Sequence, residues 1–442
     1  MRERELPDHI YTLLVEDEDS RVCRDIPEAA CHEQPRAFTL QLLAQSLTKL
    51  GDALASSRLV LAWMLSSLGA PAFFTSLLVP VRESLALLPQ LFVASAVRRH
   101  ARRKFFWVGG SVVQGLALAA MVPAVLLLQG TRLGVVIVSL LAVFSLARGV
   151  CSVAAKDVLG KTISKTRRGR VTGLSASIAG GVTLLVALWL AWGPAAGSGN
   201  GGAPALLFAG ILGAAALLWW LAAGTYAGVP EVPGATEGGG NAIVEALRSL
   251  SLLVTDRDFR DFVIARALLV STAFAIPYLV VMIQQSASGA VVSFAALMLA
   301  EGLAGLLSGP LWGRWSDSRA HWVMAAAAGL SLLAMLATLA LHSAGGEWLG
   351  VAPVAAGLLF LASVSHHGVR VGRKTYLVDM AGSDKRASYT AVSNTVIGVF
   401  LFAGAGLGVL DAVYGTAAVL LLLSAVAVLA IWRALALPAV SG

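Results

Sequence analysis

The segment VVIVSLLAVFSLA (135–147) decides the fold class, because its thirteen residues contain no charged side chain and only two serines. A helix that crosses a lipid bilayer needs roughly 20 mostly apolar residues. Outward from this segment the apolar run covers residues 133–155, which is long enough. The runs LVLAWMLSSL (59–68) and VLLLLSAVAVLAIW (419–432) have the same character. The sequence therefore predicts a protein that crosses a membrane several times.

The composition of the whole chain agrees with this reading. Of its 442 residues, 57% are apolar and only 13% are charged, whereas soluble domains carry about 25% charged residues. Too few charges are present to cover a soluble surface, and the chain is too apolar to remain disordered. Both classes are excluded.

Twelve long apolar runs are present, and each is expected to form a helix because irregular backbone cannot face lipid. They lie near residues 43–66, 72–96, 105–128, 133–155, 171–192, 204–226, 260–283, 290–312, 321–341, 349–370, 389–408 and 412–433. The predicted fold class is an all-α polytopic membrane protein with twelve transmembrane helices.

Residues 1–38 differ from the rest, since they hold ten acidic residues against five arginines. They contain neither the apolar segment nor the cleavage site of a signal peptide. The composition predicts a disordered, solvated cytoplasmic tail, with a partner-binding role as the alternative.

Lysine and arginine set the orientation of the spans, because they gather in cytoplasmic loops. RRHARRK (98–104) and KTISKTRRGR (161–170) lie in connections on one side, whereas the opposite connections are almost free of basic residues. Both termini are therefore predicted to be cytoplasmic, beside anionic lipid headgroups. This placement accounts for the net charge of +8 without a nucleic-acid partner. A bacterial plasma membrane (inner membrane) is the expected location.

One long connection divides the spans six and six. Residues 227–259 begin with the flexible linker GVPEVPGATEGGG (228–240). Ile243, Leu247, Leu250 and Val254 then share one face of a predicted amphipathic helix on the membrane surface. The predicted units are a bundle at 39–226, this linker, a bundle at 260–434 and a short tail at 435–442.

The two bundles are related by an internal repeat. Glu83 and Glu301 are 218 residues apart, as are Lys156 and Lys374, and each pair lies on matching helices. Arg170 and Arg386 are 216 apart. Three pairs at nearly one offset predict two pseudo-symmetric six-helix halves of parallel topology.

With these features the chain resembles the major facilitator superfamily (MFS) of transporters. The most specific match is GRWSDSR (313–319), which is similar to the loop signature of the family. The resemblance implies a cytoplasmic latch at Gly313, Asp317 and Arg319, in which Gly313 permits a tight turn and the loop restrains rocking of the halves. It also implies a permease that moves a small molecule by alternating access, as a symporter or an antiporter.

The chain departs from the family pattern in two places. In SAVRRHARRK (95–104), Ser95 stands where the glycine is expected and Arg99 where the aspartate is expected. The fifth helix has LSASIAGGV (174–182) without the proline of antiporters. Export is therefore not favoured by the sequence.

Two carboxylates at the predicted mid-membrane depth are the strongest functional signal. An ionisable group there costs about 2.5–3.5 kcal/mol on insertion scales and persists where it pairs, lines water or titrates. Glu83 and Glu301 are accordingly the candidates for proton coupling. The alternative for Glu83 is a structural ion pair with Arg58 or Arg82.

Basic and polar residues in the spans are candidates for substrate binding or gating. These are Arg58, Arg148, Arg266, His366 and Asn394, which can give the cavity a positive field for an anionic substrate. The alternatives are that Arg148 and Arg266 pair with Asp52 or with backbone carbonyls. The charged residues at predicted helix ends are expected to reach water instead; they are Lys156, Asp157, Arg370, Arg373, Lys374 and Asp379.

No metal site, cofactor site or catalytic constellation is predicted, so the chain is not expected to be an enzyme. The cysteines Cys23, Cys31 and Cys151 lack metal-ligand spacing and are expected to be free thiols. No nucleotide-binding loop is present. The sequence predicts a monomeric secondary active transporter with the MFS fold. The alternative is a non-transporting membrane sensor or assembly factor of the same fold, whose acidic tail binds partners.

Overall fold

The protein is helical over nearly all of the chain that its structure, a computed structural model, describes. The described residues are 26–88, 99–192, 204–234, 250–287 and 290–440, with Tyr11, Gln90, Val93, Ala96 and Val97 as single positions. The N-terminal half contains α2 (Glu28–His32), α3 (Gln34–Leu54), α4 (Val60–Ser67), α5 (Ala72–Leu87), α7 (Lys104–Leu127), α8 (Gly130–Thr162), α9 (Lys165–Trp192) and α11 (Pro204–Ala227). The C-terminal half contains α13 (Leu252–Thr255), α14 (Arg257–Leu268), α15 (Ser271–Ser286), α16 (Ala290–Ser343), η2 (Glu347–Gly350), α17 (Ala352–Ala403), η3 (Gly404–Gly406), α18 (Leu407–Tyr414) and α19 (Thr416–Leu435).

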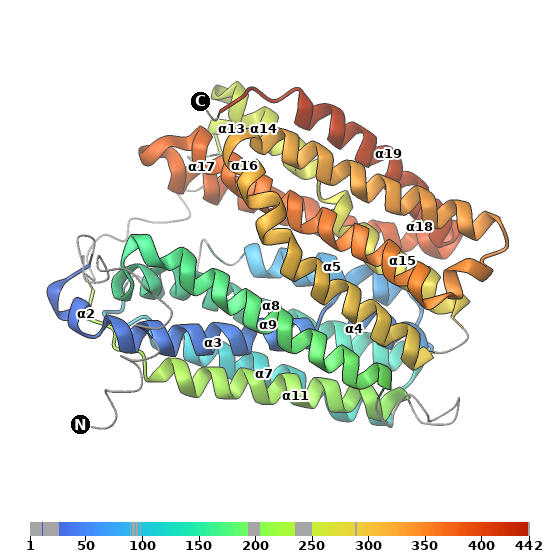
Figure 1. Cartoon of the computed structure of the whole chain (residues 1–442), viewed down its shortest axis with the longest axis horizontal. Coiled ribbons are helices and arrows are strands. Elements are labelled where there is room, and N and C mark those ends of the chain that lie inside the picture. Colours follow the sequence, from blue (N-terminus) through green and yellow to red (C-terminus); the bar gives the residue numbers. More distant parts are fainter. Residues whose placement is uncertain are drawn as a thin grey trace.

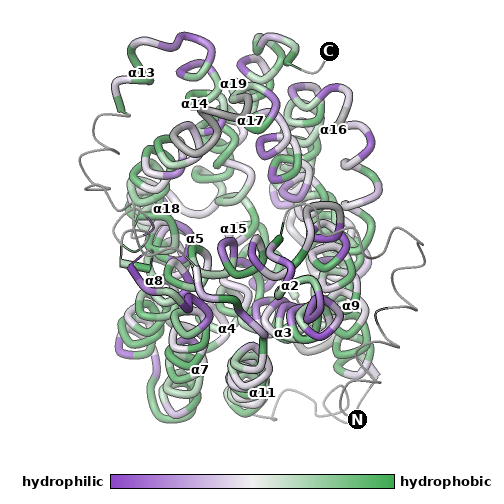
Figure 2. The backbone as a smooth tube through the Cα atoms, turned by 90° about the vertical axis from the view of Figure 1, so that its left-hand side faces the viewer, coloured by the Kyte–Doolittle hydropathy of each residue, from purple (hydrophilic) through white to green (hydrophobic). Residues whose placement is uncertain are grey.

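The helices form two bundles, one from each half of the chain (Figure 1). Figure 2 looks along the molecule and shows α5 and α15 between the bundles. Helix α2 and the segment that follows α19 lie at the same end, on the left of Figure 1. We call this the inner end, because the sequence predicts that it faces the cytoplasm, and the other the outer end.

Ten helices of the described chain are long and apolar enough to cross a membrane. Two of them come from α16, which bends at Arg319, and others come from α17 and its continuation through α18. The predicted spans 43–66 and 72–96 are not among the ten. The first is divided into α3 and α4, and α5 has only 16 residues. The all-α membrane fold class is therefore confirmed; ten spans are found within the described residues, and five positions of the predicted span 72–96 lie outside them.

The outer surfaces of both bundles suit a lipid environment. Large apolar side chains are exposed along α7, α9, α11 and α19, among them Leu116, Leu185, Leu217 and Leu421. An apolar surface of this extent is not found on soluble monomers. One hydrophobic core spans both halves, and a second lies within the C-terminal bundle.

Contacts between the bundles lie at mid-membrane depth and toward the outer end. Ser66 in α4 donates a hydrogen bond to Gln284 in α15 at 2.7 Å, and Trp63 packs on Phe294. Deeper in the molecule, Ser84 in α5 donates to the backbone oxygen of Gly398 in α17 at 2.7 Å. Helix α9 also packs on α16. The described bundles are therefore joined mainly away from the inner end.

Residues 26–38 of the acidic N-terminal segment contain helix α2 and the start of α3, whereas residues 1–10 and 12–25 lie outside the described part. Helix α3 begins at Gln34, and Phe38 is completely buried. Gln34 donates to the hydroxyl of Tyr11 at 2.7 Å and accepts from the backbone N–H of Ser164 at 3.2 Å. The boundary at residue 38 missed this packing, because charge composition does not show which few side chains find buried partners.

Two further expectations concern the cysteines and the predicted amphipathic helix. Cys31 is disulfide-bonded, so the prediction of free thiols is wrong there, while Cys151 is free and buried. The expectation rested on cellular compartment, which does not report which parts of the chain lie close together. Most of the predicted amphipathic helix, including Ile243 and Leu247, lies outside the described residues.

Gly149 in α8 provides a test of how closely the helices must pack. A Cβ atom at Gly149 would lie 3.1 Å from the backbone oxygen of Ala86 in α5. We expect Gly149→Val to reduce stability by about 1–3 kcal/mol, because rigid backbone cannot move aside as a flexible side chain does. Thermal unfolding in detergent measures the effect. The control is Gly160→Val in the same helix, where a Cβ atom meets nothing within 4 Å; equal melting temperatures for the two variants would contradict the packing assignment.

Candidate functional site

The first membrane segment is interrupted near the centre of the molecule, since α3 ends at Leu54 and α4 begins at Val60. In the matching seventh segment α14 ends at Leu268 and α15 begins at Ser271, but the two residues between them keep right-handed helical backbone angles. Non-helical backbone at membrane depth persists only where it is buried in protein or lines a wet cavity. Discontinuous helices are typical of transporter binding sites. The break at residues 55–59 therefore marks the place where a site is expected.

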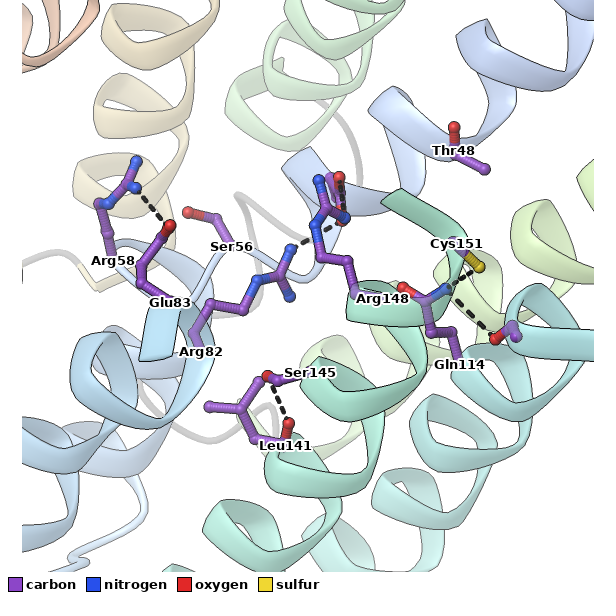
Figure 3. Close-up of polar contacts among 12 residues, drawn as sticks. Thr48, Ser56, Arg58, Arg82, Glu83, Gln114, Leu141, Ser145, Arg148 and Cys151 are labelled. Atoms are coloured by element: carbon purple, nitrogen blue, oxygen red, sulfur yellow. Dashed lines mark hydrogen bonds and ion pairs between the residues drawn. The ribbon is translucent and has the colours of Figure 1, made fainter. Parts of the chain in front are cut away.

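Asp52, just before the first break, holds two arginines from different helices. Arg82 in α5 lies 2.8 Å from its carboxylate, and Arg148 in α8 lies 2.5 Å from it (Figure 3). The Arg82 guanidinium also lies 4.5 Å from the ring centre of Phe144. The structure therefore contains the Arg148–Asp52 ion pair that the sequence analysis gave as the alternative to a substrate-binding role. This shared ion pair joins α3, α5 and α8.

Glu83 is paired as well, with Arg58 in the break of the first segment. Their side chains are 2.8 Å apart, and Figure 3 shows the two pointing toward each other. Arg58 is 16% exposed and Glu83 is 36% exposed. The structural ion pair that the sequence offered as the alternative is therefore present. A proton on Glu83 would have to displace this cation.

Glu301 is in a different position. It lies in α16 of the other bundle, and its carboxylate accepts a long hydrogen bond of 3.5 Å from Ser56. Arg58 is near enough to act on it electrostatically, but no ion pair with a described residue forms. The two predicted coupling residues thus share Arg58 as a neighbour, and only Glu83 is bound to it.

Helix α17 brings further cations to the same region. Arg370 lies within electrostatic range of Arg58, Glu83 and Arg148 of the opposite bundle, and Arg373 is close to Arg370. The sequence had assigned both residues to a helix end facing water. Arg370 is exposed, and its apolar helix continues to Ala381, so the residue lies within the helix rather than at its end. A span of 30 residues is longer than a bilayer requires, which the predicted boundary concealed.

His366 lies one turn before Arg370 on the same helix. It is 7% exposed, and neither ring nitrogen has a hydrogen-bond partner in the described chain. Of the charged groups near His366, Arg58 and Arg370 exert the strongest electrostatic effects on it. The structure therefore places His366 in the central cluster.

Arg266 and Asn394 lie elsewhere, within the C-terminal bundle. Arg266 in α14 is buried and donates to Ser393 at 2.5 Å and to Asn394 at 2.9 Å. These contacts join α14 to the second span of α17. Neither residue contacts the central ion pairs, and Asn394 uses its oxygen to hold Arg266.

The predicted cytoplasmic latch differs in local structure from the expectation. Gly313 lies inside α16 rather than in a tight turn, and the bend is at Arg319, with φ −148° and ψ 64°. The side chain of Asp317 lies outside the described part. A helix can continue through glycine when no close approach forces a turn there, and a Cβ atom at Gly313 would meet nothing within 4 Å.

The first copy of this loop, at residues 95–104, lacks the expected aspartate. Two acidic residues from other parts of the chain bind its inner-end arginine and backbone instead. Arg103 forms an ion pair with Asp157 at the inner end of α8. Glu231 accepts hydrogen bonds from the backbone N–H groups of Arg103 and Lys104 at 2.9 and 2.8 Å. Glu231 comes from the linker after α11, and sequence reasoning missed it because its partners are backbone groups distant in sequence.

Within the described residues, no group of three or more histidine, cysteine, aspartate or glutamate side chains could hold a metal ion. The arrangement is instead a set of guanidinium groups and carboxylates between two bundles, which is suited to binding charged solutes.

The chain is similar to known transporters in sequence and in fold. The family model of the Major Facilitator Superfamily matches residues 42–405. No curated protein matches the sequence. Among solved structures, a POT family transporter in complex with a thioalcohol-conjugated peptide has a TM-score of 0.69 and 13% identity, covering 93% of this chain and 98% of that one.

Two further structures are similar in fold. A mutant form of the nucleoside transporter NupG has a TM-score of 0.63 and 12% identity, covering 90% of this chain and 99% of that one. The xylose transporter XylE from E. coli, in a partially occluded inward-open conformation, has a TM-score of 0.62 and 12% identity, covering 90% and 98%. At these identities the likeness concerns the fold.

The contribution of the Asp52 carboxylate, which Arg82 and Arg148 share, can be tested through the stability of the protein. Asp52→Asn leaves two guanidinium groups without their acid, of which Arg82 is 10% exposed and Arg148 is 36% exposed, so we expect a cost of about 1–3 kcal/mol that comes mainly from Arg82. We expect a fall in melting temperature in detergent. The control is Asp261→Asn, which breaks the ion pair with Arg433 at the inner end, where both partners are more than a fifth exposed, and should cost about 1 kcal/mol or less. Similar losses for both variants would mean that the central pair carries no special weight.

Proposed function

Because the chain belongs to the Major Facilitator Superfamily, we propose that it is a secondary active transporter that moves a small anionic solute by alternating access. The proposed site is the central cluster between the bundles. The solved structures of similar fold include transporters of peptides, nucleosides and xylose, so the fold accommodates solutes of different charge. The solute of this chain must be inferred from its own side chains.

The observation that carries the proposal is the charge of the cluster. It contains five arginines (Arg58, Arg82, Arg148, Arg370 and Arg373) and three carboxyl groups (Asp52, Glu83 and Glu301). With all groups ionised, the excess is 5 − 3 = 2 positive charges. Charges in a site walled by apolar helices act with little screening, so this excess attracts an anion.

Donor groups in the cluster support the same conclusion. Arg58 Nε and Arg82 Nη1 are buried and lack hydrogen-bond partners in the described chain. Guanidinium N–H groups form their strongest hydrogen bonds with carboxylates and phosphates. An anionic solute would satisfy these donors, whereas a cation would leave them unpaired and add repulsion.

The contacts between the bundles support an inward-facing state. The cross-bundle hydrogen bonds of Ser56, Ser66 and Ser84 lie at mid-membrane depth or nearer the outer end. At the inner ends, Lys156 of α8 and Lys374 of α17 act on each other as like charges. Like charges oppose closure, so the site is proposed to exchange its solute with the cytoplasm in this state.

Glu301 is the proposed proton-coupling residue, in preference to Glu83. Protonation of Glu83 would break its 2.8 Å ion pair with Arg58. Glu301 has no such pair, and its hydrogen bond to Ser56 joins α16 to the opposite bundle. A change of protonation at Glu301 would thus act directly on a contact between the bundles.

The orientation completes the proposal. Arg167 and Arg168 lie at the inner end with the C-terminal segment, and basic residues favour the cytoplasmic side. The termini are therefore proposed to be cytoplasmic, in a bacterial plasma membrane with anionic lipid headgroups at this face. A monomer is sufficient, because the proposed site is contained within one chain.

Reconstituted vesicles test the function. A panel of radiolabelled anionic, zwitterionic and cationic metabolites is offered first, and we expect an anion to give the largest flux. Glu301→Gln should then remove the acceleration by an imposed pH gradient, while exchange of that anion without a gradient persists. The control is Glu347→Gln in the exposed outer connection η2.

Two results would contradict the proposal. A preference for cationic solutes would refute the anionic substrate. Full coupling to the pH gradient in Glu301→Gln would refute its proton role while leaving transport itself in place.

A further inference from the structure

We propose that Arg370, Arg373 and His366 of α17 form a subsite for a doubly negative oxyanion group of the solute, such as a phosphate monoester or two neighbouring carboxylates. The inference rests on the proposed function and specifies its substrate class. It assigns one part of the solute to the C-terminal bundle, apart from the ion pairs of the N-terminal bundle.

The three residues lie on one face of α17. They occupy positions i, i+4 and i+7, which are neighbours on a helix surface. At 1.5 Å per residue, Arg370 and Arg373 are separated by a rise of about 4.5 Å, and His366 lies about 10 Å farther from the inner end than Arg373. Two guanidinium groups at this spacing can both reach one oxyanion.

This face is directed toward the opposite bundle. Arg370 acts electrostatically on Arg58, Glu83 and Asp52, and Arg373 acts on Glu83 and Arg58. Residues that faced lipid could not have such neighbours. The exposed surface of Arg370 is therefore surface between the bundles, where a solute can reach it.

Charge pairing distinguishes these two arginines from the others. Arg58 has Glu83, while Arg82 and Arg148 share Asp52. Across the described chain, neither Arg370 nor Arg373 forms a hydrogen bond or ion pair. The two also act on each other as like charges. A doubly negative group bound between them would remove this repulsion and supply both missing counter-charges.

His366 is the second, independent sign of a ligand. Polar atoms that are buried this deeply nearly always have a hydrogen-bond partner, yet both ring nitrogens of His366 lack one. The residue is 93% buried, at 7% exposure, and it lies beside Arg370. A ligand oxygen can accept from the ring N–H and so satisfy a group that the fold leaves without a partner.

The geometry of the guanidinium group selects the chemical class. Its planar fork binds two oxygens of a carboxylate or phosphate at once, which a spherical halide ion cannot match. Two forks can engage an oxyanion through several oxygens. We therefore expect selection for the number of negative charges and for oxygen acceptors, and only weak binding of chloride.

The test uses purified full-length protein and a series of probes matched in size. Succinate, its monoamide succinamate and its diamide succinamide carry two, one and no negative charges, and glycerol 3-phosphate and inorganic phosphate represent the tetrahedral group. Thermal shift and titration calorimetry are recorded at constant ionic strength. In wild type we expect at least one doubly negative probe to bind about tenfold more tightly than succinamate, because a lost charge-assisted hydrogen bond costs about that factor.

The variants are Arg370→Gln and Arg373→Gln, with Lys374→Gln as the matched control. Lys374 carries the same charge one turn after Arg370, nearer the inner end, where it acts on Lys156 of α8 rather than on the central ion pairs. We expect the two arginine variants to lose the preference for the doubly negative probe and Lys374→Gln to keep it. Without ligand, the arginine variants should melt at or above the wild-type temperature, because one of two repelling charges is gone. A structural arginine would show the opposite.

The outcomes separate this inference from the proposed function. Equal binding of charged and uncharged probes by wild type, no binding of any doubly negative probe, or an equal loss in Lys374→Gln would overturn the subsite. Anion flux that is unaffected by Arg370→Gln would also overturn it, while transport would stand. Selective binding that depends on Arg370, without flux of any solute, would support the subsite and refute the transporter.

Discussion

The ion pair that Asp52 forms with Arg82 and Arg148 is the interaction on which the rest of the structure depends. Charges in an apolar bundle are tolerated only when they are compensated. One carboxylate here compensates two guanidinium groups from α5 and α8, at distances of 2.8 and 2.5 Å. It thereby fixes three helices beside the break that follows α3 and allows Arg58 to occupy that break.

Charge compensation is unequal in the two bundles, and this inequality connects the structure with a transport cycle. The N-terminal bundle contains the acids Asp52 and Glu83, whereas Arg370 and Arg373 of the C-terminal bundle lack acid partners in the described chain. Arg370 also acts on Arg58 and Arg148 across the gap. Without a solute, these like charges oppose the approach of the bundles. In the proposed cycle, a bound anion reverses the sign of the interaction, so that closure becomes favourable when the site is occupied.

Sequence reasoning found the class of fold and named several residues of the proposed site. The apolar runs gave the membrane helices, and the buried carboxylates indicated Glu83, Glu301 and their region. It missed the break at residues 55–59, because this segment contains neither the proline nor the glycine that usually marks the end of a helix. It also missed the role of Arg370, since the predicted span ended at that residue while the helix continues to Ala381. Hydropathy reports where apolar residues are, but neither where a helix unwinds nor which charges meet across a bundle interface.

Charge balance also bears on the direction of coupling. Glu301 and the proposed anion site share Arg58 as a neighbour. A proton on Glu301 removes one negative charge from the cluster, so an anion binds more tightly to the protonated protein. Coupling of binding free energies is reciprocal, so the anion must favour protonation of Glu301 to the same degree. Proton and anion therefore tend to occupy the protein together and to leave it together, which favours symport over antiport for the proposed transporter.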